Sequence, residues 1–195
     1  MPATRRLIAV AFTLALPALA MGIDFDESVS GDLSGDQSMP TSLGGLAEGT
    51  TTVAGSTAPV PIDQDFFSFE ILPGTALGSI TLADYDGPFG GGSFIAIVSG
   101  VGFSTLTDPS GYLGNALIGT QAGSLQGEDI LDDMGGTAFG GIGFTGALGP
   151  GEYTIWYQET AGDTDYTFEL NVIPAPGALA FLGLASVASM RRRRA

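Results

Sequence analysis

Two pairs of aspartates, each separated by a single residue, have a spacing that could do chemistry. They are Asp63/Asp65 and Asp84/Asp86, and both adjoin segments with strand-like alternation. Side chains two residues apart in an extended strand point to the same face, so each pair could present its carboxylates together. Carboxylates are ligands that Ca²⁺ prefers, and two of them across a cleft can hydrolyse glycosides. The four aspartates are therefore candidate calcium ligands, and Asp63 with Asp65 is a candidate two-carboxylate hydrolase pair.

A simpler interpretation assigns these aspartates to turns. An Asp side chain often accepts a hydrogen bond from the backbone two residues on, and acidic side chains on loops are commonly just solvated. The sequence contains no twelve-residue EF-hand pattern, no Gly-Gly-x-Gly-x-Asp repeat and no sign of a cleft. We therefore favour turn capping and keep calcium binding as the alternative.

The residue types that are absent limit the chemistry further. The chain has no His and no Cys, and its six basic residues are Arg5, Arg6, Arg191, Arg192, Arg193 and Arg194. An imidazole base, a thiolate nucleophile, a Schiff-base lysine and a disulfide are all excluded from the intervening region. We expect no enzyme activity and no required cofactor.

The charge distribution argues against a nucleic-acid partner. All 21 acidic residues lie between Asp24 and Glu169, and the formal net charge is −15. A region with this many carboxylates and no basic side chain repels phosphate groups.

The single tryptophan is the candidate for glycan binding. In the segment 152–158 Trp156 falls on the face opposite Tyr153, Ile155 and Tyr157. If those three side chains face the core, Trp156 is exposed, and an exposed aromatic ring can stack on a sugar. We treat Trp156 as a candidate sugar-stacking residue.

The elements that would position these residues are strands. The chain has 31 glycines and little helical periodicity, whereas several segments alternate apolar and polar residues. We expect 152–158 and 165–172 to form an antiparallel hairpin across the loop 159–164. Many short strands separated by turns predict an all-β fold, an antiparallel β-sandwich or jelly roll. The predicted strands are 66–72, 77–85, 93–100, 137–144, 152–158 and 165–172.

The N-terminus has the three parts of a secretory signal peptide. Arg5 and Arg6 provide the positive region, 7–16 is apolar, and Ala18 and Ala20 fit a small-x-small cleavage site. We expect a signal helix that signal peptidase removes after residue 20.

The C-terminus predicts a short membrane anchor. Pro174 and Pro176 disfavour a helix, and the apolar residues 177–190 are followed by a cluster of four arginines, 191–194. A helix over the 16 residues from Ala175 to Met190 would span roughly 24 Å, less than the ~30 Å hydrocarbon core. The arginines would hold the end of this marginal span in the cytoplasm.

This order of proline motif, apolar helix and arginine cluster resembles the PEP-CTERM sorting signal of Gram-negative bacteria. Ala175 stands where the signal usually has Glu. The resemblance implies recognition by an exosortase, a membrane-embedded transpeptidase-like enzyme. It also implies removal of the tail after transient anchoring in the inner membrane, and release or attachment of the protein outside it. The residues that match the signal are Pro174, Ala175, Pro176, Gly177, Arg191, Arg192, Arg193 and Arg194.

The folded region resembles the bacterial pre-peptidase C-terminal domain. The resemblance rests on "DQDFFSFEILPG" (63–74) and on "LGPGEYTIWYQETAGDTDYTFELNV" (148–172), and it is loose in 75–147. It implies a jelly-roll module that is accessory and non-catalytic. The segment 31–57 is similar to leaders that precede such domains in exported proteins with this sorting signal.

Together these features predict an exported, sortase-processed protein of the cell surface or extracellular matrix that acts in adhesion or assembly. The alternative is a carbohydrate-binding module, assisted by calcium, with exopolysaccharide as its partner. The expected organisation is a signal peptide (1–20), a leader with the first strands (21–60), a β-sandwich core (61–173) and the sorting signal (174–195).

Overall fold

The computed structural model describes residues 25–88, 92–119, 125–137 and 139–175. Strands form most of the regular structure, and the α-helices of this part are single turns of four residues. The elements are β1 (Phe25–Asp26), α1 (Glu27–Ser30), β2 (Thr41–Leu46), β3 (Gly49–Thr57), β4 (Gln64–Ile71), β5 (Thr75–Asp86), β6 (Ser93–Ser99), a 3₁₀ turn (Pro109–Gly111), β7 (Gly114–Ile118), α2 (Leu131–Met134), β8 (Gly151–Gln158) and β9 (Thr164–Pro174).

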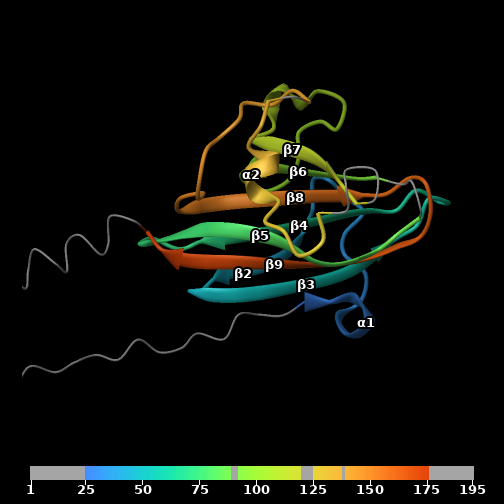
Figure 1. The fold of residues 1–195 in the computed structure, drawn as a ribbon, viewed down its shortest axis with the longest axis horizontal. Coiled ribbons are helices and arrows are strands. Elements are labelled where there is room, and N and C mark those ends of the chain that lie inside the picture. Colours follow the sequence, from blue (N-terminus) through green and yellow to red (C-terminus); the bar gives the residue numbers. More distant parts are fainter. Residues whose placement is uncertain (1–24, 89–91, 120–124, 138, 176–195) are drawn as a thin grey trace, which may run out of the picture.

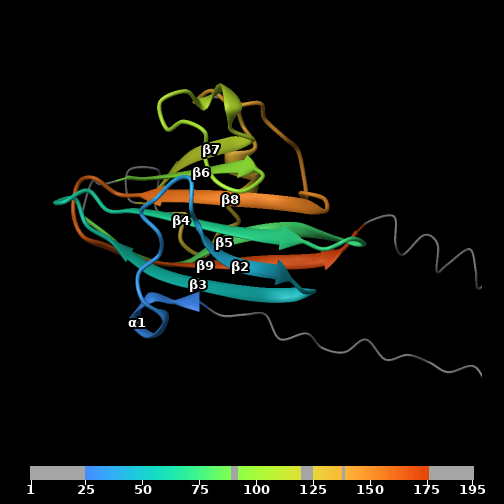
Figure 2. The same cartoon turned by 180° about the vertical axis from the view of Figure 1, so that it is seen from behind.

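The strands form two sheets, which confirms the prediction of an all-β fold. Sheet A has the order β1-β3-β9-β5, and sheet B has the order β2-β4-β8-β6-β7. Figures 1 and 2 show the strands of the two sheets from opposite sides, with α1 beside β3 and with β7 at the top as the edge strand of sheet B. The predicted terminal helices, 1–20 and 177–190, lie outside the described residues.

Most connections cross from one sheet to the other. The chain passes from β2 in sheet B to β3 in sheet A and back to β4 in sheet B. Two crossings reverse its direction twice, so the neighbours β2 and β4 run parallel, as do β1 and β3. The expectation of purely antiparallel sheets is therefore wrong at these two edges. Residues 25–60 contribute strands to both sheets.

One buried core draws side chains from both sheets. In β4 the alternation sends Phe67, Phe69 and Ile71 into it, whereas Glu70 is exposed. Strands β8 and β9 each contribute one alternating face to the same cluster. Their members there are Tyr153, Ile155, Tyr157, Tyr166, Phe168, Leu170 and Val172.

The predicted hairpin between β8 and β9 is wrong. β8 pairs with β4 and β6 in sheet B, whereas β9 pairs with β3 and β5 in sheet A. The two strands meet through their inner faces, with the ring centroids of Tyr157 and Tyr166 4.2 Å apart. β9 instead fills the place between β3 and β5, where it forms hydrogen-bonded ladders on both of its edges.

The predicted strand at 137–144 is also absent from its described residues. Gly140, Gly141 and Gly143 have φ angles of 85°, 96° and 81°, which extended strands do not adopt. The backbone of this segment instead donates to the carbonyls of Tyr112 and Leu113.

The domain has two ends, which different residues mark. We call one end of the domain the Asp65 end. It is marked by Asp65 near the start of β4, Tyr157 near the end of β8 and Tyr166 near the start of β9. The opposite end, where β9 finishes, is the Pro174 end; Figure 1 shows it on the left. From Tyr166 to Pro174 the strand extends roughly 26 Å at about 3.3 Å per residue.

Candidate functional site: a carboxylate group at the Asp65 end

Asp65 is a carboxylate placed inside the core. It is the second residue of β4 and lies on the same face as Phe67 and Phe69, because side chains alternate along a strand. Its side chain is fully buried, with 0 % of its surface exposed. Burying a charge in this way is costly unless partners compensate for the lost water.

Only half of the Asp65 carboxylate has a hydrogen-bond partner. Oδ2 accepts a 2.7 Å bond from the Tyr166 hydroxyl, which reaches across from sheet A. Oδ1 is buried, and none of the residues that the structure describes donates a hydrogen bond to it. Buried polar atoms almost always have a partner, so this oxygen marks an incomplete environment.

The N-terminal segment adds two more carboxylates to Asp65. Carboxylate oxygens of Glu27, Asp32 and Asp65 all lie within 4.8 Å of one another, and we call these three residues the carboxylate group. Glu27 is half-buried and Asp32 is exposed, so the group runs from the core to the surface.

The local sequence explains how Glu27 and Asp32 reach this place. Asp26 caps α1 by accepting from the Ser28 amide, and Gly31, with φ 89°, turns the chain after one helical turn. The Leu33 amide then donates to Glu27 Oε1 at 2.8 Å, which closes the segment on itself. Glu27 Oε2 accepts from the Ser56 amide at 2.7 Å, which fixes the segment to β3.

A glycine on β3 makes room for the carboxylate group. Gly55 lies opposite Tyr166 in the register of sheet A. A Cβ at this position would lie 2.5 Å from the Tyr166 hydroxyl oxygen and 3.0 Å from Cδ of Glu27. Any side chain other than hydrogen would therefore displace the two groups that surround Asp65.

Burial and like charge act together on these acids. Burial, reinforced by the negative charges of Glu27, Asp63 and Asp32, raises the pKa of Asp65 to about 8, although the Tyr166 hydrogen bond opposes this. Burial also raises the pKa of Glu27, as it does that of Asp63, where Asp32 adds to the effect. Residues 25–175 contain no basic side chain that could compensate.

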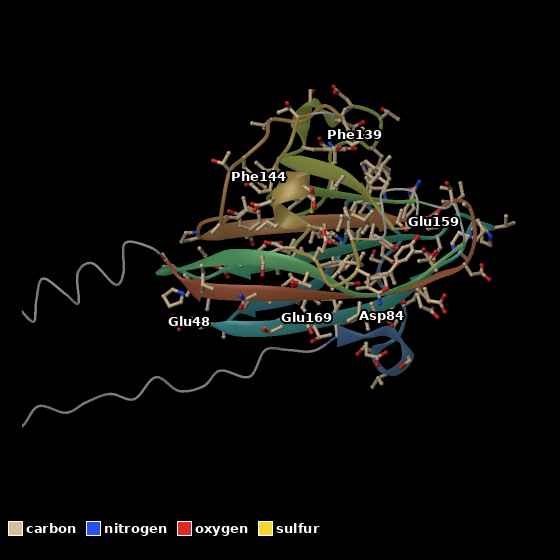
Figure 3. All side chains as sticks on the ribbon, in the orientation of Figure 1. Glu48, Asp84, Phe139, Phe144, Glu159 and Glu169 are labelled. Carbon is tan, nitrogen blue, oxygen red and sulfur yellow. The ribbon has the colours of Figure 1, made fainter. Side chains whose placement is uncertain are left out.

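A second buried carboxylate at the same end has a complete set of partners. Glu159 is 1 % exposed and holds the crossing from β8 to β9 (Figure 3). Its Oε1 accepts from the amides of Thr160 and Ala161, both at 2.7 Å. Its Oε2 accepts from the hydroxyls of Ser93 and Tyr85 at 3.1 and 3.3 Å. Glu159 has four donors where Asp65 has one.

The sequence-predicted aspartates separate in the structure. Asp65 joins the carboxylate group, and Asp63 lies near enough to raise its pKa. Asp84 and Asp86 are exposed and are not members of the group. Asp84 Oδ1 instead accepts from the Tyr85 amide and from Gln126.

The turn-capping interpretation holds for several other acids. Asp26, Asp36, Asp108 and Asp129 each accept a hydrogen bond from the amide two residues further on. Asp65 has no such bond in its environment, so capping does not explain it.

Sequence analysis missed Glu27 and Asp32 as site residues. They lie 38 and 33 positions before Asp65, and the pattern around them indicates only a capped turn. The one available signal was the "DFDES" run at 24–28, in which Asp26 precedes a Ser two residues later, as an N-cap does.

The expectation that Trp156 is exposed is wrong. It does lie on the face opposite Tyr153, Ile155 and Tyr157, but its side chain is only 7 % exposed. A second apolar cluster covers this outer face of sheet B, because the segment after β6 folds over it. The cluster contains Phe66, Ala96, Val98, Phe103, Tyr112 and Trp156. Trp156 therefore packs among aromatic rings, which leave little of its surface exposed.

Most of the predicted cleavage and sorting residues lie outside the described part of the chain. Of the sorting motif, Pro174 ends β9, and the Ala175 amide donates to the Gly74 carbonyl at 2.9 Å. Within the described ranges no helix is long and apolar enough to cross a membrane. The predicted residues that fall outside these ranges are Ala18, Ala20, Pro176, Gly177, Arg191, Arg192, Arg193 and Arg194.

Comparisons with protein-family models, with curated proteins and with solved structures found no match for this chain.

Proposed function

We propose that this chain is an exported protein of the cell surface or extracellular matrix, whose folded part is a non-catalytic β-sandwich of the jelly-roll class. In this proposal the N-terminal 20 residues direct export, and an exosortase-type enzyme processes the segment after Pro174. The folded part acts in adhesion or assembly.

The observation that carries the proposal is the position of the last strand. β9 lies between β3 and β5 and forms hydrogen-bonded ladders with both. The sorting segment begins where this central strand ends. A tail attached there transmits force into two ladders, which suits a domain held to a surface by its C-terminus.

The composition of the domain supports the same function. Residues 25–175 have neither His, Cys, Lys nor Arg, so the common catalytic side chains other than carboxylates and hydroxyls are missing.

The test is the intact mass and location of the protein in its native host. We expect a mature chain that starts at Met21 and lacks the arginine cluster, recovered outside the inner membrane. In a strain without the exosortase the mass should include residues 177–195, and the protein should stay in the membrane fraction.

Two tail variants sharpen this test. Replacing both prolines (Pro174→Ala with Pro176→Ala) should reproduce the exosortase-negative result, whereas Ser189→Ala, a small change within the apolar run, should be processed normally. The same mass and location in both strains would rule out the sorting assignment.

A further inference from the structure

We propose that Glu27, Asp32 and Asp65 bind one Ca²⁺ ion, which fastens the N-terminal segment 25–33 to the Asp65 end of the domain. This goes beyond the proposed function, because it concerns a metal site and does not depend on how the protein is exported.

The spacing of the three carboxylates fits a shared ion. Ca²⁺ binds oxygens at about 2.3–2.6 Å, so two oxygens on the same ion are at most roughly 5 Å apart. The oxygens of the carboxylate group lie within 4.8 Å of one another. Small side-chain adjustments would bring all three oxygens onto one ion lying between them.

Asp65 provides an independent reason to place an ion here. Its Oδ1 is buried without a hydrogen-bond donor, while Tyr166 occupies Oδ2. The contrast with Glu159 shows that this end of the domain can satisfy a buried carboxylate fully with its own donors. At Asp65 the missing partner is a cation that the described chain does not supply.

The charge and the ligand type select a divalent, oxygen-loving ion. Three carboxylates converge with Asp63 nearby, and residues 25–175 have no basic side chain. Ca²⁺ accepts six to eight oxygens in flexible geometry, whereas Mg²⁺ demands a near-ideal octahedron and keeps several waters. A group that combines a rigid core carboxylate with an exposed one from a turn suits Ca²⁺. Water can complete the coordination on the exposed side, at Asp32.

The ion would link parts of the chain that otherwise repel. Segment 25–33 holds Glu27 and Asp32, and β4 holds Asp65. When all three carboxyl groups are ionised and no cation is bound, their like charges push the segment away from the core, against the Glu27 bond to the Ser56 amide and the burial of Leu33. Ca²⁺ turns this repulsion into a cross-link.

The experiment is a calcium titration of the full-length chain in neutral detergent after treatment with a chelator. Isothermal titration calorimetry should show one Ca²⁺ ion per chain, with a dissociation constant on the order of 10⁻⁴ M, as in extracellular modules. Asp65→Asn and Asp32→Asn should each weaken binding at least tenfold. Asp36→Asn is the matched control, because Asp36 is an exposed aspartate of the same region that only caps a turn.

A second measurement tests what the ion holds. Amide hydrogen exchange of peptides that cover 25–33 should slow on addition of Ca²⁺, since the Leu33 amide depends on Glu27. Peptides from β7 should not change. Asp32→Asn alters an exposed side chain and should fold normally. In this variant calcium should change the exchange of neither the 25–33 peptides nor the β7 peptides.

The calorimetric results for the three variants decide between the outcomes. Binding that disappears in both site variants and persists in Asp36→Asn supports the proposal. No heat at 5 mM Ca²⁺, binding that survives in Asp65→Asn and Asp32→Asn, or equal affinity for Mg²⁺ would each overturn it.

Discussion

At the scale of single residues, the two buried carboxylates of one domain end behave differently. Glu159 receives four hydrogen bonds and needs nothing more, whereas Asp65 receives one. A buried carboxylate with few donors resists ionisation, because the charged form loses more solvation than it regains. Asp65 is therefore the residue whose protonation should respond to conditions.

The cation-free protein should lose stability as the pH rises. Burial raises the pKa of folded Asp65 to about 8, whereas the unfolded value is about 3.9. Between these two values the folded state holds a proton that the unfolded state has released. The contribution of Asp65 to the free energy of unfolding is therefore full below about pH 4 and is lost as the pH rises towards 8. The melting temperature in EGTA should fall between pH 5 and pH 8.5.

Asp65→Asn is the comparison for this pH profile. The amide cannot ionise, so the variant should show a flatter profile than the wild-type chain and a higher melting temperature at pH 8.5. Equal slopes for both proteins would mean that Asp65 is not the group that titrates.

At the scale of elements, alternation identified the inner faces of the strands but not their partners. The faces of β4, β8 and β9 follow from side-chain alternation, since period two is a property of the strand itself. The partner of a strand depends on where its connection leads. The connection between β8 and β9, residues 159–163, is as short as a hairpin loop, yet it crosses between sheets.

The same limit explains what was missed at the carboxylate group. β3 is rich in Thr and Gly and was not singled out, although it pairs with β9 over nine residues and carries Gly55. The carboxylate group and its hydrogen bond from Tyr166 bring together the capped turn of α1, the start of β4 and a hydroxyl from sheet A. Local patterns indicate each part, but only the fold brings them together.

Glu159 should be essential to the crossing from β8 to β9. Glu159→Gln keeps the size of the side chain but replaces one acceptor oxygen with a donor, which opposes two of the four bonds it receives. We expect a loss of about 1–3 kcal/mol in the free energy of unfolding, measured by urea titration.

The matched control is Glu152→Gln, the same substitution at the exposed start of β8. It should change the free energy of unfolding by less than about 0.5 kcal/mol. If the two variants are equally stable, the hydrogen bonds of Glu159 do not hold the crossing in solution.

At the scale of the whole molecule, the two ends have separate roles. The carboxylate group lies at the Asp65 end, as does the β8–β9 crossing with Glu159 (Figure 3), whereas β9 finishes at the Pro174 end (Figure 1). In a protein tethered by its tail, the proposed calcium site would therefore face away from the point of attachment. Calcium and tethering can then act on the domain without interfering with each other.

The two apolar clusters should nevertheless unfold as one unit. The main core takes side chains from both sheets, and the second cluster shares the backbones of β4, β6 and β8 with it. Trp156 lies in the second cluster, so its fluorescence reports that cluster, while far-UV circular dichroism reports the strands. We expect both signals to follow the same urea transition, because Trp156 and Ile155 alternate on one strand and cannot lose their packing independently. A Trp156 transition at clearly lower urea would show instead that the covering segment detaches first, and that the outer face of sheet B is a separate cooperative unit.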